Sequence, residues 1–386
     1  MARIGVNPAG IRIMAPKLLH YNLKLEDLSP AQANIIKQDM LSIGGEAAVS
    51  SGTVSCSIDH TGALVSGTAR QVSLLVDKLR GQSMGLGEVA SAMEEALRNA
   101  AARVFEVKGR SRAWTLGART LVMGVVNVTP DSFSDGGRLQ GVDAAVAHAM
   151  GLAEHADWID VGGESTRPGA EPVDTDEELG RVVPLVRALA DRGVTVSVDT
   201  TKAEVARQAL EAGAEIINDV SALGADPEMG GVCAGYGAAV ILMHMRGTPR
   251  TMQDDTAYED LTAEVFRYLH ARMEFAVSRG IEPDRIIIDP GLGFGKSPEG
   301  NIELLANLAE FRSLGRPILV GPSRKSFIGA LTGDPDPLGG ARLFGTASAS
   351  AAAALKGAHI VRVHDAREAR AAVAVADAIR ESGQGI

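Results

Sequence analysis

Eight short runs of apolar, largely β-branched residues recur through the last two thirds of this 386-residue chain. In order they occupy 121–128, 158–163, 195–199, 215–220, 239–244, 286–291, 317–323 and 359–364. Amphipathic, Ala-rich segments of helical length, such as 142–156 and 262–280, lie between them. Strands that are apolar on both faces and alternate with helices are typical of parallel sheets covered on both sides. Eight strand–helix units in about 270 residues therefore predict a (β/α)8 TIM barrel over 113–386.

A doubly wound open sheet is the alternative architecture for the same rhythm. A dinucleotide-binding sheet of that kind carries a G-x-G-x-x-G turn after its first strand. The first run here, 121–128, is followed by TPDSFSDGG instead. This weakens the dinucleotide-binding version of the open sheet and favours the barrel.

Each of the eight runs becomes polar at its C-terminal end. The residues at these ends are Asn127, Asp160, Asp199, Asn218, His244, Asp289, Ser323 with Lys325, and Arg362 with His364. In a parallel barrel the C-terminal strand ends meet on one face, which is where barrel enzymes place their active sites. One buried Asp or Asn is often a structural cap, but a polar residue at nearly every strand end predicts a convergent site.

Residues 1–112 do not follow this rhythm. We expect a strand at 20–27, a helix from the N-cap Ser29 to 44, two strands at 46–59 and 62–69 around the turn DHTG, and helices at 70–81 and 86–101. This βαββα order predicts a small α+β, ferredoxin-like domain before the barrel. No cluster of charged residues in it indicates chemistry, and its role stays open.

The charge balance narrows the range of partners. The net charge is −10 and the pI about 5.4, which argues against broad binding of nucleic acid or of anionic membranes. No run of about 18 apolar residues and no signal-peptide core occur, so we expect no membrane span and a cytoplasmic protein. The two cysteines, Cys56 and Cys233, are too few for a disulfide framework and lack metal-site spacing, so we expect both to be small buried packing residues.

The strand-end motifs resemble those of the dihydropteroate synthase family of pterin-binding barrels. The matching stretches are MGVVNVTPDSFSDGG (123–137), IDVGGESTRPG (159–169), VSVDTTK (196–202), EIINDVSAL (215–223), LMHMRGTPRTMQ (242–253), DPGLGFGKSPEGN (289–301), VGPSRKSFIG (320–329) and GAHIVRVHDA (357–366). The resemblance implies a transferase of the kind that sulfonamides target, which joins 6-hydroxymethyl-7,8-dihydropterin diphosphate to 4-aminobenzoate, releases diphosphate and forms 7,8-dihydropteroate. It also implies a dissociative substitution at the pterin methylene and a homodimer.

The resemblance assigns the pterin ring to four strand-end residues. Asp289 would accept the N3–H and 2-amino donors of the ring as a forked pair, the strongest match for that edge. Asp199 and Asn218 would contact other ring nitrogens, and Lys325 the ring oxygen or N5. A purely structural alternative for Asp289 is that it caps its own Pro-Gly turn.

The diphosphate needs cations and donors. Arg362 and His364 alternate in R-V-H, so we expect both to point to the same side and to stabilise the leaving group. With Asp199, Asn218, Asp289 and Lys325 they complete the expected catalytic set. The resemblance also implies Mg²⁺ on the diphosphate, with Asn127 as its protein ligand. The sequence alone does not indicate a metal, because it has no His, Cys or carboxylate cluster with metal-ligand spacing.

The aminobenzoate site is expected from two loops, 129–137 and 162–170, which have the composition of mobile lids. The residues assigned to it by resemblance are Phe133, Asp135, Thr166, Arg167, Pro168, Phe294 and Ser326, with Met243 added as a lining residue. For Met243 packing is the simpler interpretation. His244 could act in the site or serve in packing, and the sequence does not decide between these roles.

Two other functions are considered. A pterin methyltransferase that serves a corrinoid protein would use the same barrel but would have no diphosphate for Arg362 and His364 to hold. A non-enzymatic pterin-binding protein would fit the extra domain, but the residues expected for chemistry are all present.

Overall fold

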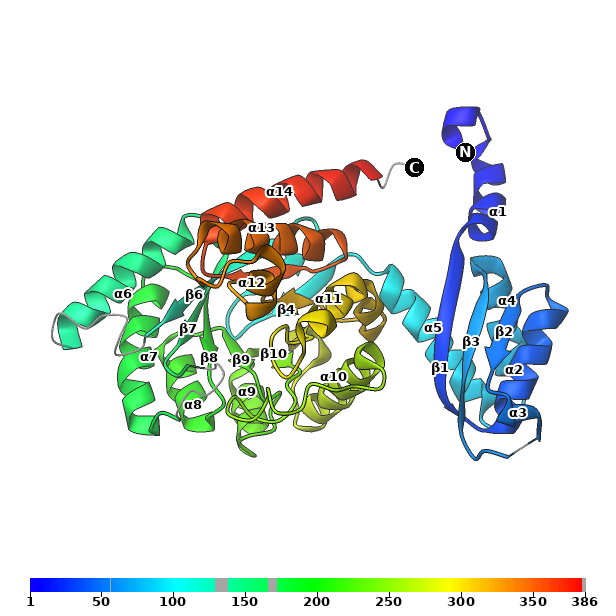
Figure 1. Cartoon of the computed structure of the whole chain (residues 1–386), viewed down its shortest axis with the longest axis horizontal. Coiled ribbons are helices and arrows are strands. Elements are labelled where there is room, and N and C mark those ends of the chain that lie inside the picture. The colour runs from blue at the N-terminus through cyan, green and yellow to red at the C-terminus, as the bar shows by residue number, and fades with distance from the viewer. Residues whose placement is uncertain (56, 129–137, 166–171, 384–386) are drawn as a thin grey trace. The chain divides into compact units, whose positions relative to one another are not determined.

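A computed structural model describes residues 1–55, 57–128, 138–165 and 172–383 (Figure 1). The chain divides into two compact units, Met1–Asn99 and Ala100–Ile386. Among the described residues no helix combines the length and the apolar character that a membrane crossing requires.

The second unit is built on eight parallel strands in the order β11-β10-β9-β8-β7-β6-β13-β12. Their bounds are β6 (Leu121–Asn127), β7 (Trp158–Gly162), β8 (Val196–Asp199), β9 (Ile216–Asp219), β10 (Ala239–Met243), β11 (Ile286–Asp289), β12 (Leu319–Val320) and β13 (Ile360–Val363). A parallel bridge between Ile288 and Ile318 joins the two ends of this order. The predicted TIM barrel and all eight of its strands are therefore confirmed.

Helices follow the strands and surround them (Figure 1). They are α6 (Arg138–Ala153), α7 (Thr175–Ala190), α8 (Ala203–Ala212), α9 (Met229–Tyr236), α10 (Leu261–Ser278), α11 (Pro298–Ala306), α12 (Ser326–Thr332), α13 (Gly340–Leu355) and α14 (Ala366–Gly383), with 3-10 turns at Pro283–Arg285 and Leu308–Leu314. The tight turns after several helices use glycine, as at Gly213, whose φ of 114° disfavours any side chain.

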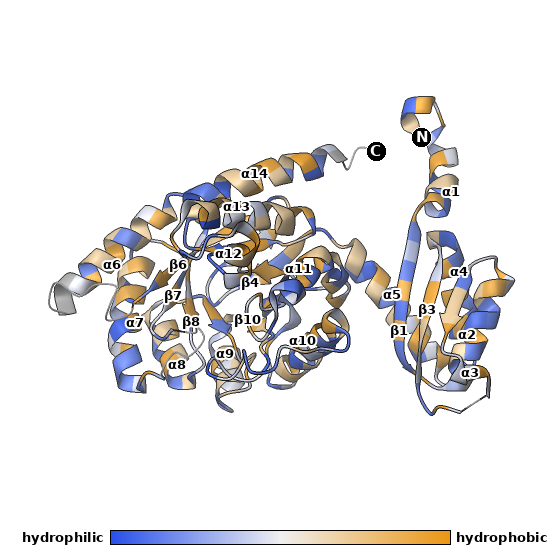
Figure 2. Ribbon diagram, viewed as in Figure 1, coloured by the Kyte–Doolittle hydropathy of each residue, from blue (hydrophilic) through white to orange (hydrophobic). Residues whose placement is uncertain are grey.

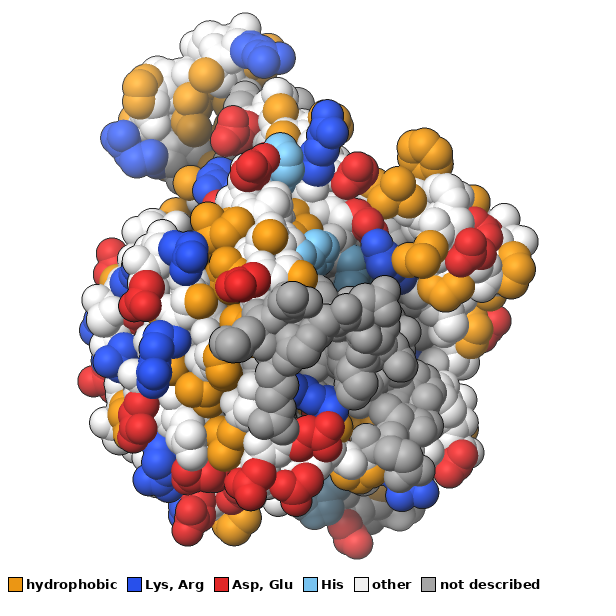
Figure 3. Space-filling model, turned by 90° about the vertical axis from the view of Figure 1, so that its left-hand side faces the viewer, with side chains coloured by type: hydrophobic (Ala, Val, Ile, Leu, Met, Phe, Trp, Pro, Cys, Tyr) orange, Lys and Arg blue, Asp and Glu red, His pale blue; other side chains and the backbone are white. Residues whose placement is uncertain are grey.

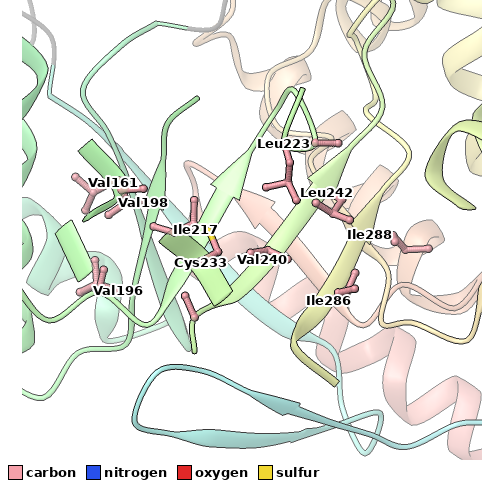
Figure 4. Close-up of a cluster of buried hydrophobic side chains, with 14 of the residues drawn as sticks. Val161, Val196, Val198, Ile217, Leu223, Cys233, Val240, Leu242, Ile286 and Ile288 are labelled. Carbon is pink, nitrogen blue, oxygen red and sulfur yellow. The ribbon is translucent and has the colours of Figure 1, made fainter. Parts of the chain in front are cut away.

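The main core lies between the strands and the outer helices, and the apolar residues concentrate on the strands (Figure 2). Figure 4 shows part of it, with Val161, Val198, Ile217, Val240 and Ile288 contributed by successive strands. Cys233 is buried in the same cluster, and burial raises the pKa of its thiol to about 12. This cysteine is therefore a packing residue, as expected.

An antiparallel hairpin, β4 (Phe105–Lys108) and β5 (Ala113–Leu116), packs where the barrel strands begin. Glu215, immediately before β9, accepts hydrogen bonds from the Ser111 N–H at 2.8 Å and from the Arg112 N–H at 3.3 Å. Trp114 contacts Trp158 edge to face, with ring centroids 5.0 Å apart. These contacts make the hairpin part of the barrel unit, so that unit begins at Ala100 and not at the predicted residue 113.

The first unit holds an antiparallel sheet in the order β1-β3-β2, formed by β1 (His20–Leu28), β2 (Glu46–Val49) and β3 (Thr61–Thr68). Its helices are α1 (Pro8–Leu18), α2 (Pro30–Ser42), α3 (Gly52–Ser55), α4 (Ala69–Arg80) and α5 (Leu86–Ala101). The strands and longer helices follow the expected βαββα order, which is a ferredoxin-like motif without its last strand. Ser29 caps α2 in a capping box with Gln32, as its position predicts.

Two parts of this unit differ from the sequence prediction. Helix α1 was not anticipated, and none of its residues is buried. The strand expected over 46–59 ends at Val49, because the ladder with β3 stops there and the short helix α3 follows.

Acidic and basic side chains are interspersed on the face that Figure 3 shows. The side chains that Figure 3 colours by type form no extended basic surface for a polyanion.

Candidate active site

The C-terminal strand ends bring together side chains that are far apart in the sequence. Arg362 on β13 donates from Nε to Asp160 Oδ2 at 2.6 Å and from Nη2 to Asp199 Oδ2 at 2.8 Å. Asn218 on β9 donates from Nδ2 to the same oxygen of Asp160 at 3.1 Å. Strands β7, β8, β9 and β13 thus contribute to a single hydrogen-bonded cluster, as the convergent-site prediction requires.

This cluster shows that Arg362 and His364 have different surroundings. The Arg362 guanidinium is matched by two carboxylates and its side chain is 19% exposed. His364 Nδ1 lies 3.0 Å from Ser323 Oγ. Arg362 therefore compensates the charge of Asp160 and Asp199, a role that the R-V-H alternation did not indicate.

The carboxylates of Asp199 and Asp289 are unusually hard to ionise. Burial raises the pKa of Asp199 to about 7, against the opposing effect of Arg362 and with a further rise from Asp160. Burial also raises the pKa of Asp289 to about 6, although the Gly291 N–H and Lys325 act to lower it. Perturbed carboxylates at the mouth of a barrel mark a functional site.

Asp199 retains an acceptor for a ligand. Its Oδ1 is buried and has no hydrogen-bond partner among the described residues. A buried carboxylate oxygen without a donor is costly, so it fits a site whose donor arrives with the ligand.

Asp289 caps its own turn and lies among the other predicted site residues. Its Oδ1 accepts the Gly291 N–H at 2.7 Å, so the carboxylate does cap its own turn. The neighbouring loop also carries Phe294, whose ring centroid lies 4.0 Å from Lys325 Nζ in a cation–π contact. Lys325 and Arg362 both act electrostatically on Asp289. The predicted residues Asp289, Phe294, Lys325 and Arg362 therefore belong to one site.

The remaining predicted residues take different positions. Asn127 ends β6, and a Cβ built on Gly162 would lie 3.2 Å from its Oδ1. Met243 is 3% exposed and packs with Phe294 in a small apolar cluster, which agrees with the packing interpretation. Ser326 is the first residue of α12. The predicted loop residues Phe133, Asp135, Thr166, Arg167 and Pro168 lie outside the described residues.

His244 is a buried residue that packs inside the loops. Its Nδ1 lies 2.9 Å from Lys296 Nζ, and its ring contacts Tyr268 edge to face at 4.9 Å. Burial, reinforced by the positive charge of Lys296, lowers the pKa of His244 to about 2, so the ring is neutral. These contacts decide between the two interpretations of His244 in favour of packing.

Sequence reasoning missed several residues that support the site. Arg342, only 6% exposed, donates to the carbonyl oxygens of Arg324 at 3.2 Å, Lys325 at 2.8 Å and Asp334 at 3.0 Å. Arg324 has a φ of 57°, unusual for a residue with a side chain, and forms a two-bond ion pair with Asp365. These contacts hold the backbone that presents Lys325.

Lys202 supports a neighbouring loop. Its Nζ lies 2.5 Å from Glu164 Oε2, 2.5 Å from Glu178 Oε2 and 2.8 Å from the Val173 carbonyl oxygen. Glu164 and Val173 flank residues 166–171, so one ammonium binds the chain on both sides of that segment. The available signal was the position of Lys202 in VSVDTTK, three residues after the strand-end Asp199. The sequence did not indicate which groups Lys202 would bind.

The described residues contain no group of three or more His, Cys, Asp or Glu side chains able to hold a metal ion. Any metal here would depend on few protein ligands, such as Asn127.

A TIM barrel with paired buried carboxylates, a lysine and an arginine at its C-terminal strand ends defines the class of pterin-binding barrel enzymes. Residues 123–364 match the family described as "Pterin binding enzyme". The dihydropteroate synthase of Synechocystis sp. is 48% identical over 265 residues, which are 68% of this chain and 91% of that protein. The chain belongs to the dihydropteroate synthase family, whose members are transferases.

Two further relatives extend the comparison. The structure of Xanthomonas albilineans dihydropteroate synthase with 4-aminobenzoic acid has a TM-score of 0.66 and 45% identity, and the match covers 73% of this chain and 99% of that one. A probable bifunctional folylpolyglutamate synthase/dihydropteroate synthase of Halobacterium salinarum is 46% identical over 381 residues, 98% of this chain. This chain spans 45% of the length of that bifunctional relative.

Proposed function

We propose that this chain joins 6-hydroxymethyl-7,8-dihydropterin diphosphate to 4-aminobenzoate and forms 7,8-dihydropteroate and diphosphate. The observation that carries the proposal is the pair of buried carboxylates, Asp199 and Asp289, set beside Arg362 and Lys325 at the strand ends. Family membership makes a folate-synthesis role the natural context.

The pterin edge suits these carboxylates. A 2-amino-4-oxo ring presents N3–H and an amino group as adjacent donors, and ionised carboxylates are the strongest acceptors for them. Asp289 and Asp199 supply acceptor oxygens, and Asn218 supplies both a donor and an acceptor. Lys325, close to the ring of Phe294, would donate to the ring oxygen or N5.

The substitution at the pterin methylene is proposed to be dissociative. Breaking the C–O bond leaves a cation conjugated with the pterin ring, and the carboxylates of Asp199 and Asp289 favour positive charge there. His364, which neighbours Ser323, would stabilise the departing diphosphate. The arylamine, neutral at pH 7, forms the C–N bond with this cation and then loses one N–H proton to the released diphosphate or to water. Because the arylamine attacks the pterin directly, neither a strong base nor a covalent enzyme intermediate is needed.

Mg²⁺ is proposed to bind with the diphosphate. Mg²⁺ prefers oxygen ligands and keeps several waters, so a single neutral side-chain oxygen beside phosphate oxygens is a sufficient protein contribution. Asn127 Oδ1 fits because it faces Gly162, where a side chain would crowd it. The ion would neutralise charge on the leaving group.

The second substrate is proposed to be 4-aminobenzoate. One support is the Xanthomonas albilineans structure, which is a complex with 4-aminobenzoic acid. Phe294 and Ser326 would contact it, with Phe133, Asp135, Thr166, Arg167 and Pro168 contributed by the two loops.

A homodimer is proposed as the assembly. Helices α13 and α14 pack against each other and expose the apolar side chains Phe344, Leu355, Val375 and Ile379. Exposed apolar surface of this kind is typical of an interface.

The direct test is formation of dihydropteroate with release of diphosphate from the two substrates and Mg²⁺. Folded protein that binds the pterin diphosphate but gives no product would contradict the proposal. Methyl transfer from methyltetrahydrofolate to a corrinoid acceptor would replace it.

A further inference from the structure

Lys296 is a buried cation that the proposed chemistry does not use. It follows the GLGFG stretch between β11 and α11 and is 3% exposed. Its Nζ lies 2.9 Å from three acceptors: the carbonyl oxygens of Gly291 and Phe294, and His244 Nδ1. A fourth acceptor, the His244 carbonyl oxygen, is 3.4 Å away.

This set of acceptors matches an ammonium group. A lysine ammonium has three N–H donors and no acceptor, so it can satisfy three of these atoms at once. His244 is neutral, and in the tautomer that carries its proton on Nε2 the Nδ1 atom accepts from the ammonium. Burial lowers the pKa of Lys296 to about 7, while Asp289 acts to raise it. An apolar side chain here would leave the Phe294 carbonyl oxygen and His244 Nδ1 without the donor that the structure shows, and each loss is costly. The Gly291 carbonyl oxygen would keep only the Phe294 N–H, at 3.2 Å.

The loop that surrounds Lys296 has an uncommon backbone. Gly291, Gly293 and Gly295 all have positive φ, at 72°, 79° and 69°. A Cβ on Gly291 would lie 1.9 Å from the His244 carbonyl oxygen, so this loop packs directly on the chain that follows β10. Glycine adopts positive φ without strain, so these residues let the loop fold closely around Lys296, which contacts both sides of the packing.

The same backbone residues connect Lys296 to the site. The Gly291 carbonyl oxygen accepts a hydrogen bond from Lys296 Nζ, and the Gly291 N–H donates to Asp289 Oδ1 at 2.7 Å. Phe294 gives its carbonyl oxygen to Lys296, and its ring lies against Lys325. Lys296 therefore binds the backbone of Gly291, which donates to Asp289, and the backbone of Phe294 itself.

We propose that Lys296 is a positioning residue, whose ammonium holds the 290–295 loop so that Asp289 meets the pterin and Phe294 meets the arylamine. This inference rests on the proposed function and deepens it. It predicts that the positive charge and the N–H donors of Lys296 matter, and not only its volume.

The first test removes the ammonium and keeps an unbranched side chain that is one atom shorter. Lys296→Met is expected to lower kcat/KM about 10- to 100-fold, the range for losing hydrogen bonds to a charged group. The KM values for both substrates should rise, because both Asp289 and Phe294 lose their support. Lys356→Met, at an exposed position after α13, is the matched control and should behave as wild type.

The second test restores the ammonium from solution. Lys296→Ala removes three methylenes and the amine, so propylammonium has the matching shape. Propylammonium is expected to raise the activity of this variant at least about tenfold. Tetramethylammonium, a cation without N–H donors, should have no effect at the same ionic strength.

Unchanged KM values in Lys296→Met would overturn the inference. If both variants lose activity and propylammonium does not restore the activity of Lys296→Ala, then Lys296 acts in packing alone. That result would also overturn the inference. If a variant fails to fold, refolding with propylammonium gives the same decision: recovery supports the inference, and no recovery opposes it. Wild-type activity is measured separately, so failure of the proposed function is recognised on its own.

Discussion

Arg362 on the last barrel strand donates its Nε–H to Asp160 on the second, 2.6 Å away and 202 residues earlier in the chain. Asp160 is completely buried, and the same oxygen accepts from Asn218. This ion pair orients the guanidinium that also binds Asp199. Asp160 thus organises three residues of the predicted catalytic set without belonging to it.

Replacing Asp160 by Ala should destabilise the protein by about 3 to 5 kcal/mol, the usual cost of removing one partner from a buried ion pair. Arg362 would keep only Asp199, and Asn218 would lose its acceptor. The free energy of unfolding from urea denaturation checks this. Asp143→Asn, at an exposed position of α6, is the control and should change it by less than about 0.5 kcal/mol. Equal values for the two variants would contradict the pairing.

The strands of the barrel could be predicted because they are rich in apolar residues and have polar residues at or just beyond their C-terminal ends, as at Asp199 and His244. β12 has only two residues, yet its run was visible because its apolar residues are framed by Pro317 and Gly321. The missed helix α1 buries no residue, so no apolar periodicity against a core could mark it.

The partners of the site residues could not be predicted in the same way. The direction of the Arg362 side chain depends on two acids from distant strands, and a sequence does not show which charges will meet. Lys296 depends on backbone carbonyls, which every residue has and which leave no trace in the sequence. The structure was needed to separate His244, a packing residue, from the strand-end residues around it.

Pterin affinity should rise with pH between about 5 and 8. A ring N–H and amino group need an ionised acceptor, and the pKa values of Asp199 and Asp289 are raised to about 7 and about 6. Isothermal titration with 6-hydroxymethylpterin at several pH values measures this. Asp289→Asn should bind weakly and lose the step near pH 6. A flat wild-type profile would show that protonation of these carboxylates does not control binding.

The same carboxylates give the free protein an opposite trend. Their folded-state pKa values lie above the ordinary value of 3.8, so the folded state binds more protons than the unfolded state between about pH 4 and pH 7. Their contribution to the free energy of unfolding is therefore largest at low pH and declines as the pH rises. Urea denaturation of wild type and Asp199→Asn should show a smaller decline in the variant.

The barrel should be more stable after removal of residues 1–99 than after removal of residues 1–112. A fragment of 100–386 keeps the β4–β5 hairpin, whereas 113–386 removes the donors Ser111 and Arg112 from the buried Glu215. A buried carboxylate without partners costs several kcal/mol, so the shorter fragment should unfold at a clearly lower urea concentration. Glu215→Gln in the longer fragment isolates the contribution of the charge. Equal midpoints for both fragments would show that the hairpin does not support the barrel.

Lys202→Met should raise the KM for 4-aminobenzoate about tenfold and change pterin affinity by less than about twofold. The reason is that Lys202 binds Glu164 and Val173, which flank the segment with Thr166, Arg167 and Pro168, whereas no contact links it to Asp289. Steady-state kinetics in each substrate measures the first effect and pterin titration the second.

The same substitution leaves Glu178 as a buried carboxylate, 1% exposed, without its cation. Lys202→Met should therefore also lower the free energy of unfolding, and adding Glu178→Gln should recover part of that loss, because the uncompensated charge is removed. The double variant should nevertheless keep the raised KM, since Glu164 and Val173 still lack their shared donor. A KM that returns to the wild-type value together with stability would mean that Lys202 acts only through the charge of Glu178 and does not position the loop.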